Sequence, residues 1–123
     1  MMEEAKMMTH LEHEIYEQPE TLRRLLNEER AHVDALAEMI RDFDPAFVLI
    51  AARGTSDNAA RYAQYGLGIE CGMPVALAAP SIHTLYDAQP IMKRALVIGI
   101  SQSGRSEDVR QVMADARGQG ALT

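Results

Sequence analysis

Two short apolar runs constrain the fold of this chain more than any other feature of its sequence. Residues 47–52 (FVLIAA) and 95–100 (ALVIGI) contain no polar or charged side chain and show no alternation. A strand with one face in water alternates between apolar and polar residues, whereas a strand covered on both faces is apolar throughout. We therefore predict that both runs are central strands of a sheet with other elements packed on both sides.

Helical patterns separate these runs. The longest lies over 19–41, where apolar residues fall on one helical stripe interrupted at Glu29, and Pro19 suits the first turn of a helix. Further elements are expected as helices over 57–70 and about 106–117, a strand over 74–77, and a turn or short helix over 80–86. Strands that alternate with helices form a parallel sheet with helices on both faces. The expected fold class is α/β, a doubly wound parallel sheet of three strands preceded by a long helix.

The two ends of the chain carry further signals about domain organisation. Residues 1–18 are expected to form a mobile leader, because four methionines crowd the first eight positions. Residues 120–123 resemble the start of a fourth strand, and three strands make only a small doubly wound sheet. We expect residues 19–123 to be the N-terminal part of a domain whose sheet is cut before its last strands, or which a partner completes.

Charge and cysteine content argue against several kinds of partner. The 123 residues include 12 Lys and Arg against 18 Asp and Glu, a net charge of −6. Nucleic acids and anionic membranes favour clustered Lys and Arg, so neither is expected as a partner. The single cysteine, Cys71, cannot form an internal disulfide, and the acidic N-terminus is unlike a signal peptide. No apolar run approaches the ~18 residues of a membrane span. We expect a cytoplasmic protein.

Two loops rich in glycine and hydroxyl side chains follow the predicted central strands. Residues 53–58 (RGTSDN) and 101–107 (SQSGRSE) each lead from a strand into a helix. Helix N-termini attract anions, and hydroxyl groups donate to an anion without carrying a charge. With strand order 2-1-3, the loops meet at the crevice where doubly wound sheets bind ligands, and phosphate is the expected ligand. The alternative is that Ser56, Asp57 and Ser106 only cap their helices.

A nucleotide site is not expected. Residues 99–106 have the spacing of a Walker A motif, but Arg105 replaces its lysine and Gly99 falls inside the predicted strand. No G-x-G-x-x-G motif follows either strand.

Five other positions are candidates for functional groups. His10 and His13 lack a further ligand nearby, so we predict no metal site, and we expect no cofactor. His83 is expected to pack or to face solvent. Arg53 and Arg105 lie one in each loop and either neutralise an acidic ligand or are solvated.

Three stretches, 14–19 (EIYEQP), 54–56 (GTS) and 101–104 (SQSG), resemble the sugar isomerase (SIS) domain family. The resemblance is to the isomerase portion of glutamine:fructose-6-phosphate aminotransferase and to the glucosamine-6-phosphate deaminase-like proteins. It implies a flavodoxin-like five-stranded parallel sheet, usually present twice in one chain. It further implies phosphate binding by Ser101, Gln102, Ser103 and Ser106, and substrate contacts by Gly54, Thr55 and Ser56.

The chain departs from the aminotransferase pattern at two places. Arg53 stands where that pattern has cysteine, and Arg105–Ser106 stand where it has Glu-Thr, which is more similar to the deaminase-like branch. The resemblance places the catalytic groups beyond residue 123, so no catalytic residue is assigned.

The resemblance implies the phosphosugar-binding part of an aldose-ketose (amino)sugar-6-phosphate isomerase, aminotransferase or deaminase. The substrate would be fructose 6-phosphate or glucosamine 6-phosphate, and we expect a homodimer or other homo-oligomer. Two alternatives stay open. One is a non-catalytic phosphosugar sensor or regulatory module, and the other is a structural fragment whose third strand pairs with a second copy of the chain.

Overall fold

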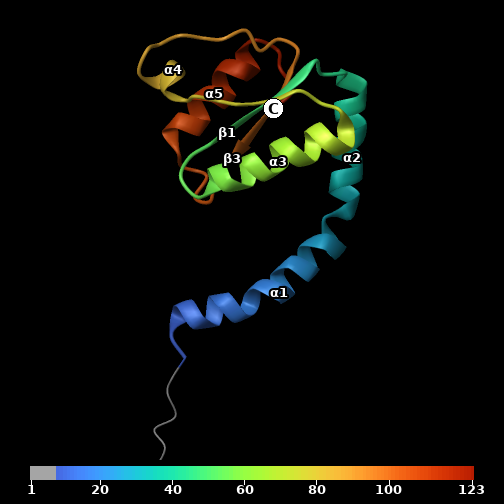
Figure 1. Cartoon of the computed structure of the whole chain (residues 1–123), viewed down its shortest axis with the longest axis vertical. Coiled ribbons are helices and arrows are strands. Elements are labelled where there is room, and N and C mark those ends of the chain that lie inside the picture. The colour runs from blue at the N-terminus through green and yellow to red at the C-terminus, as the bar shows by residue number, and fades with distance from the viewer. Residues whose placement is uncertain (1–7) are drawn as a thin grey trace, which may run out of the picture. The chain divides into compact units, whose positions relative to one another are not determined.

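The computed structural model describes residues 8–123 (Figure 1). In chain order the elements are α1 (His10–Glu28), α2 (Arg30–Phe43), β1 (Phe47–Ala52), α3 (Ser56–Cys71), β2 (Val75–Leu77), α4 (Ser81–Thr84), β3 (Ala95–Ile100) and α5 (Glu107–Gly118). The chain divides into two compact units, the first ending at Glu38 and the second running over Met39–Thr123. The second unit contains the sheet.

Helix α1 begins earlier than the sequence pattern predicted. Thr9 precedes it and forms a capping box, in which Thr9 Oγ1 accepts from the Glu12 N–H at 3.2 Å and Glu12 Oε2 accepts from the Thr9 N–H at 2.8 Å. Pro19 therefore lies inside α1, and its placement in the first helical turn was wrong. The single helix predicted over 19–41 was also wrong, because α1 ends at Glu28 and a second helix, α2, begins at Arg30; the break lies at Glu29, where the apolar stripe is interrupted.

The leader was predicted over residues 1–18. Residues 1–7 lie outside the described residues, and α1 runs without a break across positions 18 and 19. No residue of α1 or α2 is buried.

The sheet has three parallel strands in the order β2-β1-β3, so the α/β class is confirmed and the condition for a crevice shared by the two loops is met. The register of the central pair runs from Phe47 opposite Ala95 to Ala52 opposite Ile100. Because these strands are parallel and pair residue for residue over their whole length, their carboxyl ends lie side by side. The loops after β1 and β3 therefore begin at the same edge of the sheet.

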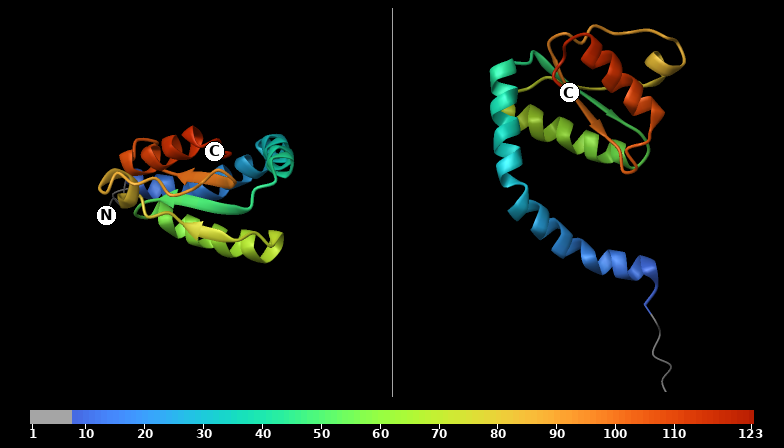
Figure 2. Two further views of the ribbon diagram at one scale, coloured as in Figure 1. Left: turned by 90° about the horizontal axis from the view of Figure 1, so that it is seen from above. Right: turned by 180° about the vertical axis from the view of Figure 1, so that it is seen from behind.

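Helices cover both faces of this sheet, α3 on one side and α5 on the other (Figure 2). Alternate side chains of each strand point to opposite faces. On the α3 side the core is Val48, Ile50, Ala52, Ala60 and Leu96, and on the α5 side it is Ala51, Met92, Ala95, Val97, Val109, Val112 and Ala116. The two apolar runs thus lack alternation because both of their faces are buried.

Gly99 lies within β3, as the sequence predicted, and the structure places it on the face covered by α5. A Cβ at this position would lie 3.0 Å from Val109 Cγ1 and 3.1 Å from Met113 Sδ. The glycine allows α5 to pack closely against the strand. It does not open a loop, as the first glycine of a Walker A motif would.

The last residues of the chain lie along the other edge of β3. Leu122 forms a parallel bridge with Leu96, in which the Val97 N–H donates to the Leu122 carbonyl at 2.8 Å and the Leu122 N–H donates to the Ala95 carbonyl at 3.1 Å. This is the position at which the sequence indicated a fourth strand. Within residues 8–123, no helix has the length and apolar character needed to cross a bilayer.

Candidate functional site

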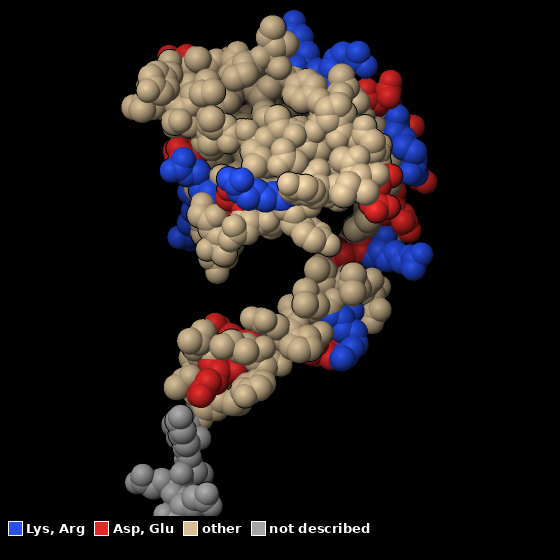
Figure 3. All heavy atoms as spheres, in the orientation of Figure 1, with Lys and Arg blue, Asp and Glu red and all other residues tan. Residues whose placement is uncertain are grey.

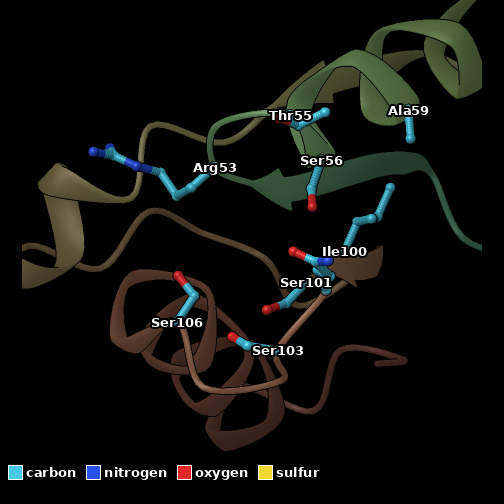
Figure 4. Close-up of a pocket in the computed structure, with 9 residues that line it drawn as sticks. Arg53, Thr55, Ser56, Ala59, Ile100, Ser101, Ser103 and Ser106 are labelled. Atoms are coloured by element: carbon cyan, nitrogen blue, oxygen red, sulfur yellow. The ribbon is translucent and has the colours of Figure 1, made fainter. Parts of the chain in front are cut away.

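The two hydroxyl-rich loops meet at the carboxyl ends of β1 and β3 (Figure 4). They enclose a cleft of about 650 Å³, which we call the hydroxyl cleft. Its lining residues are Arg53, Thr55, Ser56, Ala59, Ile100, Ser101, Gln102, Ser103 and Ser106. The cleft lies between the starts of α3 and α5, where doubly wound sheets bind their ligands.

The loop after β3 is held in shape by its own serine side chains. Ser101 Oγ accepts from the Gly104 N–H at 3.1 Å, and Ser103 Oγ accepts from the Arg105 N–H at 3.2 Å. Gly104 has φ +65°, a backbone conformation that glycine adopts at little cost. A hydroxyl has one donor and two acceptor positions, so each serine keeps its O–H free to donate. This loop therefore presents preorganised hydrogen-bond donors.

The opposite wall of the cleft comes from the start of α3. Figure 4 shows Ser56 pointing from this helix toward the side of the cleft that carries Ser101. Thr55 is the N-cap residue of α3, and Ser106 is that of α5. The hydroxyls of the two loops thus approach one space from two elements that are distant in the sequence.

Helix capping does not account for these side chains. Neither Thr55 nor Ser106 makes a side-chain cap hydrogen bond, and the Asp57 carboxylate accepts from Arg61 Nε at 3.0 Å. The first N–H groups of a helix need partners from outside the helix. Among the hydrogen bonds of residues 8–123, none uses the N–H of Glu107 or Asp108. The start of α5 therefore retains donors for an anion.

Ion pairs balance the charge around the cleft. They join Arg53 Nε to Asp108 Oδ2 (3.4 Å), Arg61 Nε to Asp57 Oδ2 (3.0 Å) and Arg110 Nη1 to Glu107 Oε2 (3.5 Å). Arg105 has no carboxylate within 4.0 Å in the part of the chain that the structure describes. On the face shown in Figure 3, basic and acidic side chains of the second unit lie interspersed around a broad uncharged area.

The structure brings together most of the residues that the sequence selected. Thr55, Ser56, Ser101, Gln102, Ser103 and Ser106 all line the hydroxyl cleft. Gly54 does not line it. This glycine lines a neighbouring cleft of about 390 Å³ between the carboxyl ends of β1 and β2, and its φ of +59° forms the turn into α3. Arg53 lines both clefts.

His83 is a packing residue, as one of the two sequence interpretations had it. It is buried, and its Nδ1 lies 2.6 Å from Asp115 Oδ2. Asp115 was missed, because a carboxylate in a helical pattern gives no sign that it is buried. His10 and His13 lie on α1, where His13 Nδ1 is 3.8 Å from Glu17 Oε2. Residues 8–123 contain no group of three or more His, Cys, Asp or Glu placed to hold a metal ion.

Comparison with known proteins identifies relatives of this architecture, although no known family profile matches the chain. Over 110 residues, 89% of the chain, it is 34% identical to the glutamine–fructose-6-phosphate aminotransferase (isomerizing) of Aquifex aeolicus. Over 106 residues it is 31% identical to the enzyme of the same name from Staphylococcus epidermidis. The chain spans 18% of the length of these relatives.

A solved structure agrees with these sequence relatives. It is the crystal structure of a "putative phosphosugar isomerase" from Silicibacter pomeroyi DSS-3, which superposes with a TM-score of 0.84 at 40% sequence identity. The superposition covers 89% of this chain and 34% of the other.

Proposed function

This chain belongs to the sugar isomerase (SIS) domain family, and from that premise we propose that residues 19–123 are the N-terminal part of an SIS domain that binds a sugar 6-phosphate. The proposed ligand is fructose 6-phosphate or glucosamine 6-phosphate. The proposed location is cytoplasmic, and the proposed assembly is a homodimer or other homo-oligomer. The names of the relatives support the substrate class.

The hydroxyl cleft is the observation that carries this proposal. A phosphate dianion requires several donors around its oxygens, and Ser101 and Ser103 offer O–H groups whose positions are set by the loop backbone. Ser106 and the N–H groups at the start of α5 add donors beside them. A hydrogen bond to a charged group contributes about 1.5–3 kcal/mol, so a few such bonds suffice for measurable affinity.

We propose that the parent protein interconverts aldose and ketose (amino)sugar 6-phosphates, as an isomerase, aminotransferase or deaminase. The reaction would transfer a proton between C1 and C2 of the sugar, with an acid/base group from outside the cleft lining. Residues that line the hydroxyl cleft carry no carboxylate, imidazole or amine. Holding the phosphate would orient the reacting carbons toward catalytic groups elsewhere.

Calorimetric titration of the 123-residue chain tests phosphate recognition. We expect fructose 6-phosphate to bind and fructose to give no measurable heat. Ser101→Ala combined with Ser103→Ala should weaken binding by roughly tenfold or more, since two charge-assisted hydrogen bonds are lost. Ser81→Ala, in the neighbouring cleft, is the matched control and should leave the affinity unchanged. Equal affinity for both sugars would contradict the proposal.

A non-catalytic sensor is the second candidate, and the lack of an acid/base group in the cleft lining is the observation that favours it. Both candidates require phosphosugar binding, so an activity assay of the parent protein separates them. An enzyme forms glucosamine 6-phosphate, releases ammonia or exchanges the C1 and C2 protons. A sensor binds the ligand without any of these changes.

A further inference from the structure

Arg53 lines the hydroxyl cleft, but a phosphate site built from hydroxyl groups gives this arginine no role. We propose that Arg53 is a specificity-determining residue of the hydroxyl cleft, which exchanges its ion pair with Asp108 for the phosphate of the ligand. The site would then favour doubly charged phosphate monoesters over singly charged or neutral analogues. This inference rests on the proposed function, because it concerns the same ligand.

The Arg53 side chain lies at the cleft, and its ion pair is exposed and weak. It follows β1 directly and lines the cleft, and Figure 4 shows it turned away from the hydroxyl groups. Its only ionic partner within 4.0 Å among residues 8–123 is Asp108, at 3.4 Å from Nε, and its side chain is 58% exposed. Exposed ion pairs contribute little to stability, so this one breaks at small cost.

A phosphate offers Arg53 a better partner than Asp108 does. The guanidinium presents several N–H donors in a plane and binds phosphate through two parallel hydrogen bonds. The pair with Asp108 is a longer contact, 3.4 Å from Nε to Oδ2. Exchange of partners would therefore leave Arg53 with more and shorter hydrogen bonds than it has without ligand.

Asp108 is held in place independently of Arg53. Its Oδ1 accepts from Thr84 Oγ1 at 3.0 Å, and it lies in the first turn of α5, where a negative charge is favourable. The carboxylate would therefore stay beside the cleft after Arg53 turned away. There its negative charge would repel a bound phosphate dianion, and the positive charge of Arg53 would offset this repulsion. Asp108 therefore competes with the ligand for Arg53.

The alternative is that the ion pair between Arg53 and Asp108 only links the loop after β1 to α5 and has no role in ligand binding. In that case replacement of Arg53 would lower the stability of the chain without changing its preference among ligands. Arg61 provides a matched control, because it is also an exposed arginine paired with an acidic residue in the first turn of a helix. Arg61 lines the neighbouring cleft and not the hydroxyl cleft.

The test is calorimetric titration of the full chain with fructose 6-phosphate at several salt concentrations. We expect R53A to weaken binding by roughly tenfold and to reduce the dependence of affinity on salt, with R61A changing affinity less than about twofold. R53K should recover part of the loss, since it restores the charge without the planar fork. D108N should tighten binding by roughly twofold to fivefold, because it removes the negative charge that holds Arg53 and repels the phosphate.

The outcomes separate this inference from the proposed function. If the unmodified chain does not bind fructose 6-phosphate, the proposed function fails. If it binds and R53A binds with the same affinity and the same salt dependence, the role of Arg53 is overturned while the proposed function stands. R53Q, which keeps a long polar side chain, answers the same question if R53A does not fold. Weaker binding by D108N would show that Asp108 contributes to the site and does not compete with it.

Discussion

His83 Nδ1 lies 2.6 Å from Asp115 Oδ2 in the interior of the second unit, with side chains only 2% and 7% exposed. The other oxygen of this carboxylate accepts from Gln111 Nε2 at 2.9 Å and from Gln89 Nε2 at 3.3 Å. About two turns earlier on α5, Asp108 accepts from Thr84. Helix α4 and the segment after it are therefore bound to α5 by polar contacts at two levels.

Replacing Asp115 with alanine should lower the free energy of unfolding by roughly 3 kcal/mol. The substitution removes the acceptor of three side chains and leaves His83 buried without its partner. Urea denaturation followed by circular dichroism measures this change. His32→Ala breaks an exposed pair with Glu29 and should cost less than about 0.5 kcal/mol. Similar losses in the two variants would contradict the importance of the buried pair.

Gly99 should tolerate added volume poorly. Gly99→Ala is expected to destabilise the chain by roughly 1 kcal/mol, because the new methyl group presses on Val109 and Met113, and Gly99→Val by roughly 3 kcal/mol. Gly66→Ala in α3 is the control. No atom lies within 4 Å of a Cβ added there, so helix propensity should make this variant more stable by roughly 0.5–1 kcal/mol. Thermal and urea unfolding would show whether the two substitutions differ in sign.

Gly104→Ala should affect ligand binding more than it affects folding. The left-handed conformation at φ +65° costs an alanine about 1–2 kcal/mol, and the loop can relieve this strain by giving up the bond from Gly104 N–H to Ser101. We therefore expect a roughly tenfold loss of affinity for fructose 6-phosphate. Gly120→Ala, at φ +82° and outside the cleft lining, should lower stability and leave affinity unaltered. Unchanged binding by Gly104→Ala would show that this loop conformation is not needed.

The Glu12 carboxyl should titrate below its ordinary value of 4.5. Hydrogen bonds from the backbone N–H and the hydroxyl of Thr9 favour the carboxylate and so lower the pKa of Glu12. The stabilisation that this bond gives α1 is thus fully present above the unfolded pKa and is lost as the pH falls through the folded pKa. Carbon NMR of the Glu12 carboxyl in a pH titration measures the shift. Thr9→Ala removes only the hydroxyl donor and should move the pKa part of the way back toward 4.5, and an unchanged value would show that the hydroxyl bond does not contribute.

The strands of this fold could be predicted because their signal is local. Residues 47–52 and 95–100 are apolar on both faces, and that pattern alone requires a covered sheet. The start of α1 was missed because Pro19 was taken as the helix start, whereas the signal lay in Thr9 and Glu12. A capping box is equally local, so the sequence contained this information.

The hydroxyl loops could likewise be assigned to one site from sequence. Thr55, Ser56, Ser101, Ser103 and Ser106 follow two strands, and parallel neighbours end at the same edge of a sheet. The sequence could not decide whether these residues bind a ligand or cap helices. The structure bears on the capping alternative alone, because neither Thr55 nor Ser106 bonds its own helix through its side chain.

The sequence by itself determined the order of strands and helices, the parallel sheet and the edge at which the loops meet, because each follows from residues that are near one another in the chain. Only the tertiary structure decided that Arg53 pairs with Asp108, that His83 is buried against Asp115 and that Gly54 lines the neighbouring cleft. These relationships join elements far apart in the sequence. Their geometry depends on how α4 and α5 pack against the sheet, and no local pattern encodes that packing.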